Sequence, residues 1–382
     1  MAHLSRIVHS ARLVDGGRVV DDAWVRIEAG RVAAIGTGGD WRYERADEII
    51  DATAVAGAGA LLSPGFIDLH GHGGGGLAYD DGAEQIVAAR EVHRAHGTTR
   101  AVVSLVTAAL PDLIHRLGVV AELARTDDTI LGSHLEGPFL DPEHHGAHDP
   151  ALLLAPDAAT VDLLLSAGAG TVRQVTIAPE LDGGLEAIPR IVAAGAVAAV
   201  GHTAADEDGA RRAYDAGATL LTHAFNAMPG LHHRDPGPVG AATADPRVTL
   251  EIIADGVHLH PEIVRLAFAA APGRVALVTD AMAAAGAPDG DYVLGALPVH
   301  VAQGIALLGD GTIAGSTLTQ DAALRTAVDA GVPVAEAVAA LTATPARVLG
   351  RRDLGSLGVG AVADAVLLDE DLTVHRVWTG RV

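Results

Sequence analysis

LLSPGFIDLHGHG, residues 61–73, decides the fold, because its short apolar run ends in two histidines within a glycine-rich segment. The part at 65–69 has the length and the flanking residues of a buried strand. Seven more apolar runs follow, at 98–106, 129–134, 172–178, 196–200, 218–222, 248–253 and 274–278. Segments of helical period separate most of them, including 83–96, 111–125, 156–167, 206–216 and 261–271. Strands that alternate with helices indicate a parallel sheet buried on both faces.

Eight such repeats predict a (β/α)8 barrel of the TIM type over residues 65–350, with closing helices at about 320–331 and 335–349. A doubly wound sheet is the alternative that this pattern leaves open. The two ends of the chain, residues 1–64 and 351–382, instead contain short strands and turns such as Gly16-Gly17 and Gly30-Arg31. We expect these ends to form one small β-sandwich.

The composition limits the chemistry that the chain can perform. Of its 382 residues 49% are apolar, which fills a large core, yet no apolar run approaches the roughly 18 residues of a membrane span. The first residues lack the features of a signal peptide, so we expect a cytoplasmic protein. Cysteine and lysine are both absent, which excludes thiolate ligands, Schiff bases and a carboxylated lysine between two metals.

The net charge of −22 opposes binding to nucleic acids and to anionic membranes. It opposes an anionic substrate as well. A phosphorylated substrate would therefore need arginine or histidine side chains at the site itself.

Candidate metal ligands follow five of the eight predicted strands. Catalytic residues of a barrel lie where its strands end, and these ends carry His70 and His72, His134 and Glu136, His202, His223, and Asp280. Imidazole and carboxylate groups suit zinc or divalent iron, and such an ion lowers the pKa of bound water towards ~7. Asp280 is the residue we expect to move the proton. The pattern predicts a metal-dependent hydrolase.

Two other features have simpler interpretations. His93 and His96 lie three residues apart on a predicted helix, and we expect them to face solvent. The glycines at 73–76 lack the spacing of a nucleotide-binding loop, so we expect a loop that stays clear of the metal.

These motifs resemble a known group of enzymes. LLSPGFIDLHGHG, with the later His, His and Asp, resembles the amidohydrolase superfamily. Within it, HLEGPFL, HHGAH, VGHT, THAFNAMPG, ADGVH, VTDAM and AGSTLT resemble the N-acetylglucosamine-6-phosphate deacetylases, in the family's order and over nearly the whole chain. The resemblance implies hydrolysis of N-acetylglucosamine 6-phosphate to glucosamine 6-phosphate and acetate.

The resemblance also implies roles for the metal ligands. Glu136, His202 and His223 would hold the principal ion, whereas His70 and His72 match members that hold a second one. One or two divalent ions per subunit, zinc or iron, are therefore expected.

The remaining implied roles concern catalysis and the substrate. Asp280 would be the base, later the acid, and also a metal ligand, while His148 would contact the sugar and polarise the amide carbonyl. The other substrate-binding residues would be Asn226, Ala227, Arg234, His258, Ile313, Ala314 and Gly315. The first four of these would bind the phosphate, and Arg234 and His258 would reach it across the interface of a homodimer.

Three alternatives stay open at this point. A nucleobase or imidazole-ring deaminase would share the metal rim but would not need Arg234 and His258. A deacetylase of an epimeric amino sugar phosphate would have the same motifs, and a non-enzymatic relative would have lost the metal. His145 stands where many relatives have lysine or cysteine, in a segment at 141–150 that we expect to act as a lid.

Overall fold

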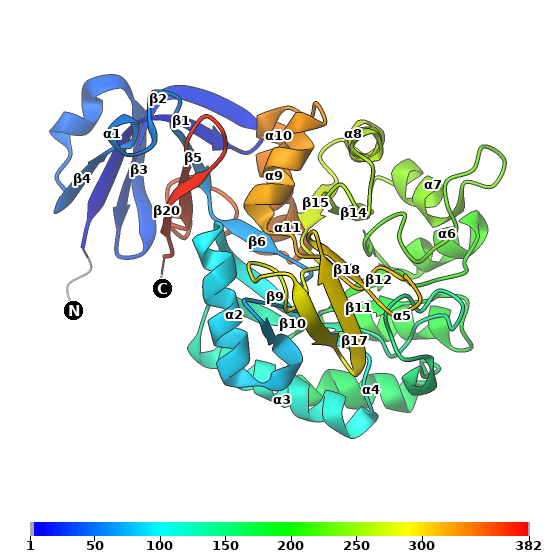
Figure 1. Ribbon diagram of the computed structural model, residues 1–382. Coiled ribbons are helices and arrows are strands. Elements are labelled where there is room, and N and C mark those ends of the chain that lie inside the picture. The colour runs from blue at the N-terminus through cyan, green and yellow to red at the C-terminus, as the bar shows by residue number, and fades with distance from the viewer. Residues whose placement is uncertain (1–3, 381–382) are drawn as a thin grey trace.

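The eight apolar runs form one parallel barrel in the computed structural model, which describes residues 4–380 (Figure 1). Each strand pairs with its neighbours in chain order, which excludes the reversed order of a doubly wound sheet and confirms the barrel prediction. The strands are β6 (Phe66–Asp68), β9 (Thr98–Val106), β10 (Ile130–Glu136), β11 (Val172–Ile177), β12 (Val197–Val200), β13 (Leu220–Leu221), β14 (Thr249–Ile253) and β15 (Val275–Val278).

The seam between the first and the last strand closes just beyond their carboxyl ends. A parallel bridge joins Gly71 to Ala281, and the backbone N–H of Asp280 donates to the carbonyl of His70 at 2.8 Å. The N–H of His72 donates to the carbonyl of Ala281 at 2.7 Å. The seam therefore places both histidines of the first strand beside Asp280.

Helices surround the barrel, and most lie where the sequence predicts them. They are α2 (Ala83–Ala95), α3 (Leu110–Thr126), α4 (Ala158–Ala167), α5 (Gly184–Ala193), α6 (Glu207–Ala216), α7 (Gly237–Ala244), α8 (Pro261–Ala270), α9 (Gln320–Asp329), α10 (Val334–Leu341) and α11 (Ala343–Val348). The single helix expected at 335–349 is two, because Pro345 has no N–H to donate to Leu341 and the chain turns at Thr342. No helix among residues 4–380 is both long and apolar enough to cross a membrane.

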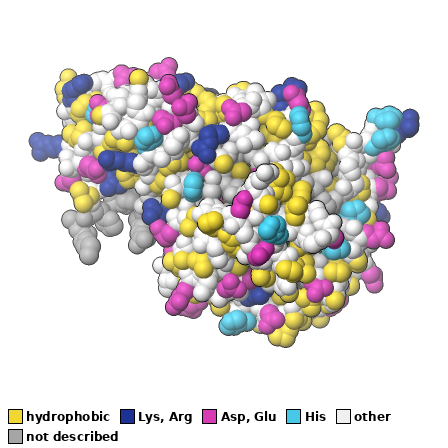
Figure 2. Space-filling model, in the orientation of Figure 1, with side chains coloured by type: hydrophobic (Ala, Val, Ile, Leu, Met, Phe, Trp, Pro, Cys, Tyr) yellow, Lys and Arg dark blue, Asp and Glu magenta, His cyan; other side chains and the backbone are white. Residues whose placement is uncertain are grey.

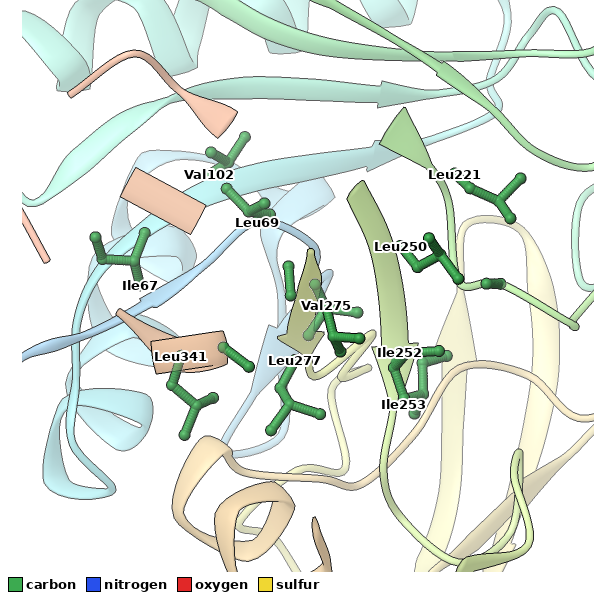
Figure 3. Packing of buried hydrophobic residues seen from close by; sticks show 14 of the residues in the cluster. Ile67, Leu69, Val102, Leu221, Leu250, Ile252, Ile253, Val275, Leu277 and Leu341 are labelled. Atoms are coloured by element: carbon green, nitrogen blue, oxygen red, sulfur yellow. The ribbon is translucent and has the colours of Figure 1, made fainter. Parts of the chain in front are cut away.

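The core consists mainly of aliphatic side chains from the strands and from the helices outside them. Figure 3 shows Ile67, Leu69, Val102, Leu250 and Leu277 of this cluster, together with Leu341 of α10 and other members. Each fully buried side chain of this size contributes roughly 1.5–3 kcal/mol. The strands that carry the site are therefore fixed from both sides of the sheet.

Both ends of the chain form a second, seven-stranded sheet, as predicted. It contains β1 (Arg6–Asp15), β2 (Arg18–Glu28), β3 (Arg31–Thr37), β4 (Glu48–Asp51), β5 (Leu61–Pro64), β19 (Ala365–Leu368) and β20 (Val374–Trp378), with η1 (Gly38–Tyr43) and α1 (Ala52–Ala56) beside them. Gly16 and Gly17 form the first turn with φ of +56° and +76°. The second turn is formed by Ala29 and Gly30, one residue earlier than predicted. The boundaries of the two units stay a prediction.

A buried ion pair joins the amino-terminal end of the barrel to the second sheet. Arg100 on β9 is only 1% exposed, and its Nε donates to Asp364 Oδ2 at 2.6 Å. Its Nη2 also donates to the carbonyl of Gly380 at 2.6 Å. All of these groups are satisfied within the protein.

Three small antiparallel strands between β15 and α9 are not predicted by the sequence. β16 (Gly290–Leu294), β17 (Leu297–Ala302) and β18 (Ile305–Leu307) pack on Val106, Ala147 and Met282. Shorter elements complete the fold, namely β7 (Gly73–Gly74), β8 (Leu77–Ala78), η2 (Tyr79–Asp81) and η3 (Pro150–Leu152). The inserted sheet matters because Leu294 and the segment after β18 form a wall of the pocket described next.

Candidate active site and metal centre

A pocket of about 580 Å³ opens at the carboxyl ends of the barrel strands. Its walls come from strand ends, from the segment at 143–148 and from the segment at 310–315. The lining includes His72, Glu136, His148, His202, His223, Asn226, Ala227, His258, Asp280, Leu294, Ile313 and Gly315. The volume suits a small molecule such as a sugar derivative.

The Glu136 carboxylate lies at the centre of the predicted ligands. Its Oε1 is 3.1 Å from Nε2 of His70, 3.1 Å from Nε2 of His223 and 3.2 Å from Nε2 of His202. Its Oε2 is 3.0 Å from Nε2 of His72. One carboxylate therefore faces two pairs of histidines.

The ligand atoms form two overlapping groups that share Glu136. In the first, Asp280 Oδ1 lies 3.4 Å from His70 Nε2 and 3.3 Å from His72 Nε2. In the second, Nε2 of His202 and Nε2 of His223 are 2.9 Å apart. Each group has the spacing of ligands around a single ion.

Three of these side chains are aimed by an unusual backbone conformation. His202, His223 and Asp280 have φ of +47°, +28° and +48°, and each is the second residue beyond its strand. Non-glycine residues with positive φ are uncommon and cluster where function imposes the conformation. The strand ends are thus bent so that these side chains meet over the barrel.

The donor set fits a divalent cation. Facing Nε2 atoms cannot both donate to each other, whereas a cation accepts both lone pairs. Burial opposes charge on His72, yet hydrogen bonds to Asp280 and Glu136 raise its pKa to about 9. No arginine among residues 4–380 lines the pocket, so no guanidinium group neutralises the carboxylates of Glu136 and Asp280. The cluster therefore attracts positive charge and could bind a metal.

Groups behind the ligands hold several imidazoles in place. His70 Nδ1 lies 3.3 Å from Glu251 Oε2, and His202 Nδ1 lies 2.8 Å from the carbonyl oxygen of His144. Such outer partners fix the ring orientation and tautomer of metal-binding histidines. Sequence reasoning missed Glu251, although a carboxylate inside the apolar run VTLEII is a visible signal.

His148 and His258 both face the pocket, and their pKa values are shifted in opposite directions. The Thr107 N–H points at His148 Nδ1 at 3.4 Å, which leaves the ring hydrogen on Nε2, and burial lowers the pKa of His148. The pKa of His258 is raised, since its hydrogen bond and charge interaction with Asp255 outweigh burial. Its Nδ1 lies 2.7 Å from Asp255 Oδ2. The pocket thus contains one imidazole whose neutral form is favoured and one whose charged form is favoured.

The structure places two predicted substrate residues outside the pocket lining. Ala314 is fully buried, and its N–H donates to the carbonyl of Ala306 on β18 at 3.0 Å. Arg234 is exposed on the turn from His232 to Asp235, in the loop that projects beside α7 (Figure 1). Arg234 does not line the pocket of its own chain.

Two expectations about other residues are wrong, and a third, about the glycines at 73–76, is not tested. His134 uses both ring nitrogens inside the barrel, at 2.9 Å from Ser104 Oγ and 2.8 Å from Thr176 Oγ1, so it is no ligand. His93 does not face solvent: it is 2% exposed and its Nε2 donates to the Gly73 carbonyl at 2.8 Å. A Cβ at Gly74 would lie 2.8 Å from that Nε2. Gly74 therefore allows close packing against His93 of α2, and Gly73 allows close packing against Leu77, Ala78 and Ala283.

Comparisons with known proteins agree with this geometry. The model of the Amidohydrolase family matches residues 61–380. The chain is 38% identical to an N-acetylgalactosamine-6-phosphate deacetylase of Escherichia coli O157:H7, over 98% of each chain. It is 34% identical to an N-acetylglucosamine-6-phosphate deacetylase of Vibrio furnissii, over 96% of this chain and 92% of that one. A solved N-acetyl-D-glucosamine-6-phosphate deacetylase of Mycobacterium smegmatis, in complex with N-acetyl-D-glucosamine-6-phosphate, is 43% identical and superposes with a TM-score of 0.92, covering 100% and 98% of the two chains.

Proposed function

The chain belongs to the amidohydrolase family, and we propose that it hydrolyses the acetamide of an N-acetylated amino sugar 6-phosphate. The reaction of its relatives is metal-dependent amide hydrolysis, which gives glucosamine 6-phosphate and acetate from N-acetylglucosamine 6-phosphate. The observation that carries the proposal is Glu136, whose carboxylate faces two histidine pairs on the floor of a sugar-sized pocket.

Six side chains would hold the metal, and Asp280 is one of them. Glu136, His202 and His223 would bind the principal ion. His70, His72 and Asp280 would bind a second one next to Glu136. Zinc or iron fits this donor set, with one or two ions per subunit. A bound divalent ion would activate water and polarise the acetyl carbonyl.

Asp280 would carry the proton during the reaction. Burial favours its neutral form, but the charge of His70 and a hydrogen bond with His72 lower the pKa of Asp280 to about 2. An ionised Asp280 on the pocket wall can accept the proton of the attacking water. The same group would then protonate the departing amine, which as an anion is a very poor leaving group.

The neutral His148 would donate its Nε2 hydrogen to the carbonyl oxygen, where negative charge develops. Its Nε2 lies 3.5 Å from Glu136 Oε2, so the donor sits next to the metal ligands. Ile313 and Gly315 would border the acetyl group and the sugar from the opposite wall, with Ala314 packed behind them.

The phosphate would bind at the other side of the pocket. His258 lines the pocket of its own chain, whereas the resemblance implies that it reaches the phosphate of the other subunit, and Asp255 favours its charged form. Asn226 and Ala227 line the same region. Figure 2 shows acidic side chains spread over the visible face, in line with the net charge of −22, so local cations decide phosphate binding. Since Arg234 cannot serve its own pocket, we place it in the pocket of the other subunit of a homodimer. A cytoplasmic location fits such a substrate, because an apolar membrane excludes a phosphate dianion.

Acetate release tests the function directly. Purified protein is incubated with N-acetylglucosamine 6-phosphate, with N-acetylgalactosamine 6-phosphate and with each unphosphorylated sugar, and its metal content is measured on the same sample. We expect acetate from one or both phosphorylated sugars. Release of ammonia from a nucleobase or an imidazole-ring substrate, with no acetate from any sugar, would instead support a deaminase.

A further inference from the structure

Glu251 is a buried carboxylate on β14 to which the proposed mechanism assigns no part. It is 0% exposed and lies inside the barrel beneath the ligand cluster. Its Oε1 accepts a hydrogen bond from Gln174 Nε2 at 2.9 Å. Its Oε2 lies 3.3 Å from His70 Nδ1 and 3.3 Å from the backbone nitrogen of His223. One oxygen of Glu251 thus touches a ligand from each of the two groups.

The contact with Glu251 determines where His70 carries its hydrogen. Nδ1 of His70 faces Glu251, whereas Nε2 faces Glu136, Asp280 and the other ligand atoms. A carboxylate at Nδ1 keeps the ring hydrogen on that nitrogen, so the lone pair of Nε2 stays free for a cation. His72 differs, because its buried Nδ1 has no hydrogen-bond partner among residues 4–380. Of this pair, only His70 is held from behind by a carboxylate.

The surroundings of Glu251 argue against a purely structural role. No arginine forms an ion pair with it within the described part of the chain, and its donors are an amide, an imidazole and a backbone N–H. A buried carboxylate with so little compensation costs stability unless positive charge lies close by. A cation beyond the His70 ring would supply that charge.

We propose that Glu251 is a positioning residue that keeps the hydrogen of His70 on Nδ1, so that the His70–His72 group holds a second divalent ion. The inference rests on the proposed metal site. It adds that Glu251 determines whether the site binds one ion or two. Glu136, His202 and His223 form the other group, in which Glu251 touches only a backbone nitrogen. Loss of Glu251 should therefore empty one position and spare the other.

Counting ions tests this directly. Apoprotein of wild type and of Glu251→Gln is titrated with Zn²⁺ by calorimetry, and bound metal is counted after dialysis. The wild type should bind two ions, and Glu251→Gln should bind the first unchanged and the second about 10–100-fold more weakly. In the background of His70→Asn, Glu251→Gln should change nothing further.

Thr176→Val is a matched control. Thr176 is equally buried, and its hydroxyl contacts His134 and Thr222. Within residues 4–380 that hydroxyl has no hydrogen bond with a proposed ligand, and the backbone pairing of Thr176 with Glu136 is kept in the variant, which should therefore still bind two ions. Should Glu251→Gln fail to fold, Gln174→Met decides, since it keeps the carboxylate but removes its donor and should also weaken the second ion.

A wild type that binds one ion, or a folded Glu251→Gln that binds two with unchanged affinity, overturns the proposal, as does unchanged second-ion binding in Gln174→Met. Acetate release is measured separately. Two bound ions without deacetylation would contradict the proposed function alone.

Discussion

The two ends of the barrel treat buried polar groups in opposite ways. At the carboxyl end, ligand atoms of the same kind face each other, and the Nδ1 atoms of His72 and His223 have no partner among residues 4–380. At the amino end, Arg100 is enclosed by Asp364 and the Gly380 carbonyl. The polar groups at the carboxyl end are therefore available to bind a ligand. Those at the amino end hydrogen-bond to each other and join the two sheets. Changes at the first end should alter chemistry, and changes at the second should alter stability.

Asp280→Asn should have the largest effect on activity of any change at the carboxyl end of the barrel. An amide in place of the carboxylate cannot accept the proton of water or return it to the amine. We expect kcat to fall by about 10²–10⁴-fold while the principal ion stays bound. Steady-state rates of acetate release and metal counts check this. Turnover close to that of the wild type would show that another group carries the proton.

Arg100→Met should produce the largest effect at the other end. It leaves the Asp364 carboxylate buried without its partner, which costs about 3–5 kcal/mol of unfolding free energy. Urea denaturation measures this loss, and the folded fraction should keep its kcat. If kcat fell while stability did not, the division between the two ends would be wrong.

Arg234→Ala tests whether the catalytic end is completed by a second subunit. Loss of a charge-assisted contact should raise KM for the phosphorylated sugar by about 10-fold or more and leave the unphosphorylated one unaffected. Mixing Arg234→Ala with Asp280→Asn subunits provides the control, because a mixed dimer has one pocket with both residues intact. Recovery of activity on mixing supports a contact between Arg234 of one subunit and the phosphate in the pocket of the other. Equal losses for both sugars count against a phosphate contact.

The smallest expected effect concerns the ion pair of His96, two residues before β9 at the amino end. His96 Nδ1 lies 3.1 Å from Asp321 Oδ1, and this hydrogen bond, working against burial, raises the pKa of His96. The folded state therefore gains stability below pH ~6.5, and this gain disappears as the pH rises through the higher pKa of the folded protein. The side chain is 39% exposed, so solvent screening limits the gain to about 1 kcal/mol or less. His96→Gln should destabilise the protein at pH 5.5 and not at pH 8.5; an equal difference at both values would assign the effect to packing.

The strands, and the clustering of the candidate ligands at their ends, could be predicted because both follow a local pattern. Each strand is an apolar run, and each ligand stands at or just beyond the end of one, as Glu136 and His202 do. What escaped depends on contacts between distant residues. From the sequence, His93 is expected on the surface and Glu251 is an isolated charge in an apolar run. The structure brings His93 against the Gly73 carbonyl and Glu251 against His70. The strands β16 to β18 were not predicted because they lie outside the strand–helix repeat of the barrel, although the alternation of buried and exposed residues in β16 and β17 is a strand signal.

The seam beside the ligands also bears on how the protein is made. Thr279 Oγ1 donates to Asp68 Oδ2 at 2.6 Å across a separation of 211 residues, and His70 and Asp280 meet at the same place. A chain emerging from the ribosome has its first strand waiting until the last strand has been synthesised. An ion bound between His70, His72 and Asp280 would join the end of the first barrel strand to be synthesised to the end of the last. Metal uptake by this group should then mark the moment at which the last barrel strand has been synthesised, before α9 to α11 and the C-terminal strands of the second sheet.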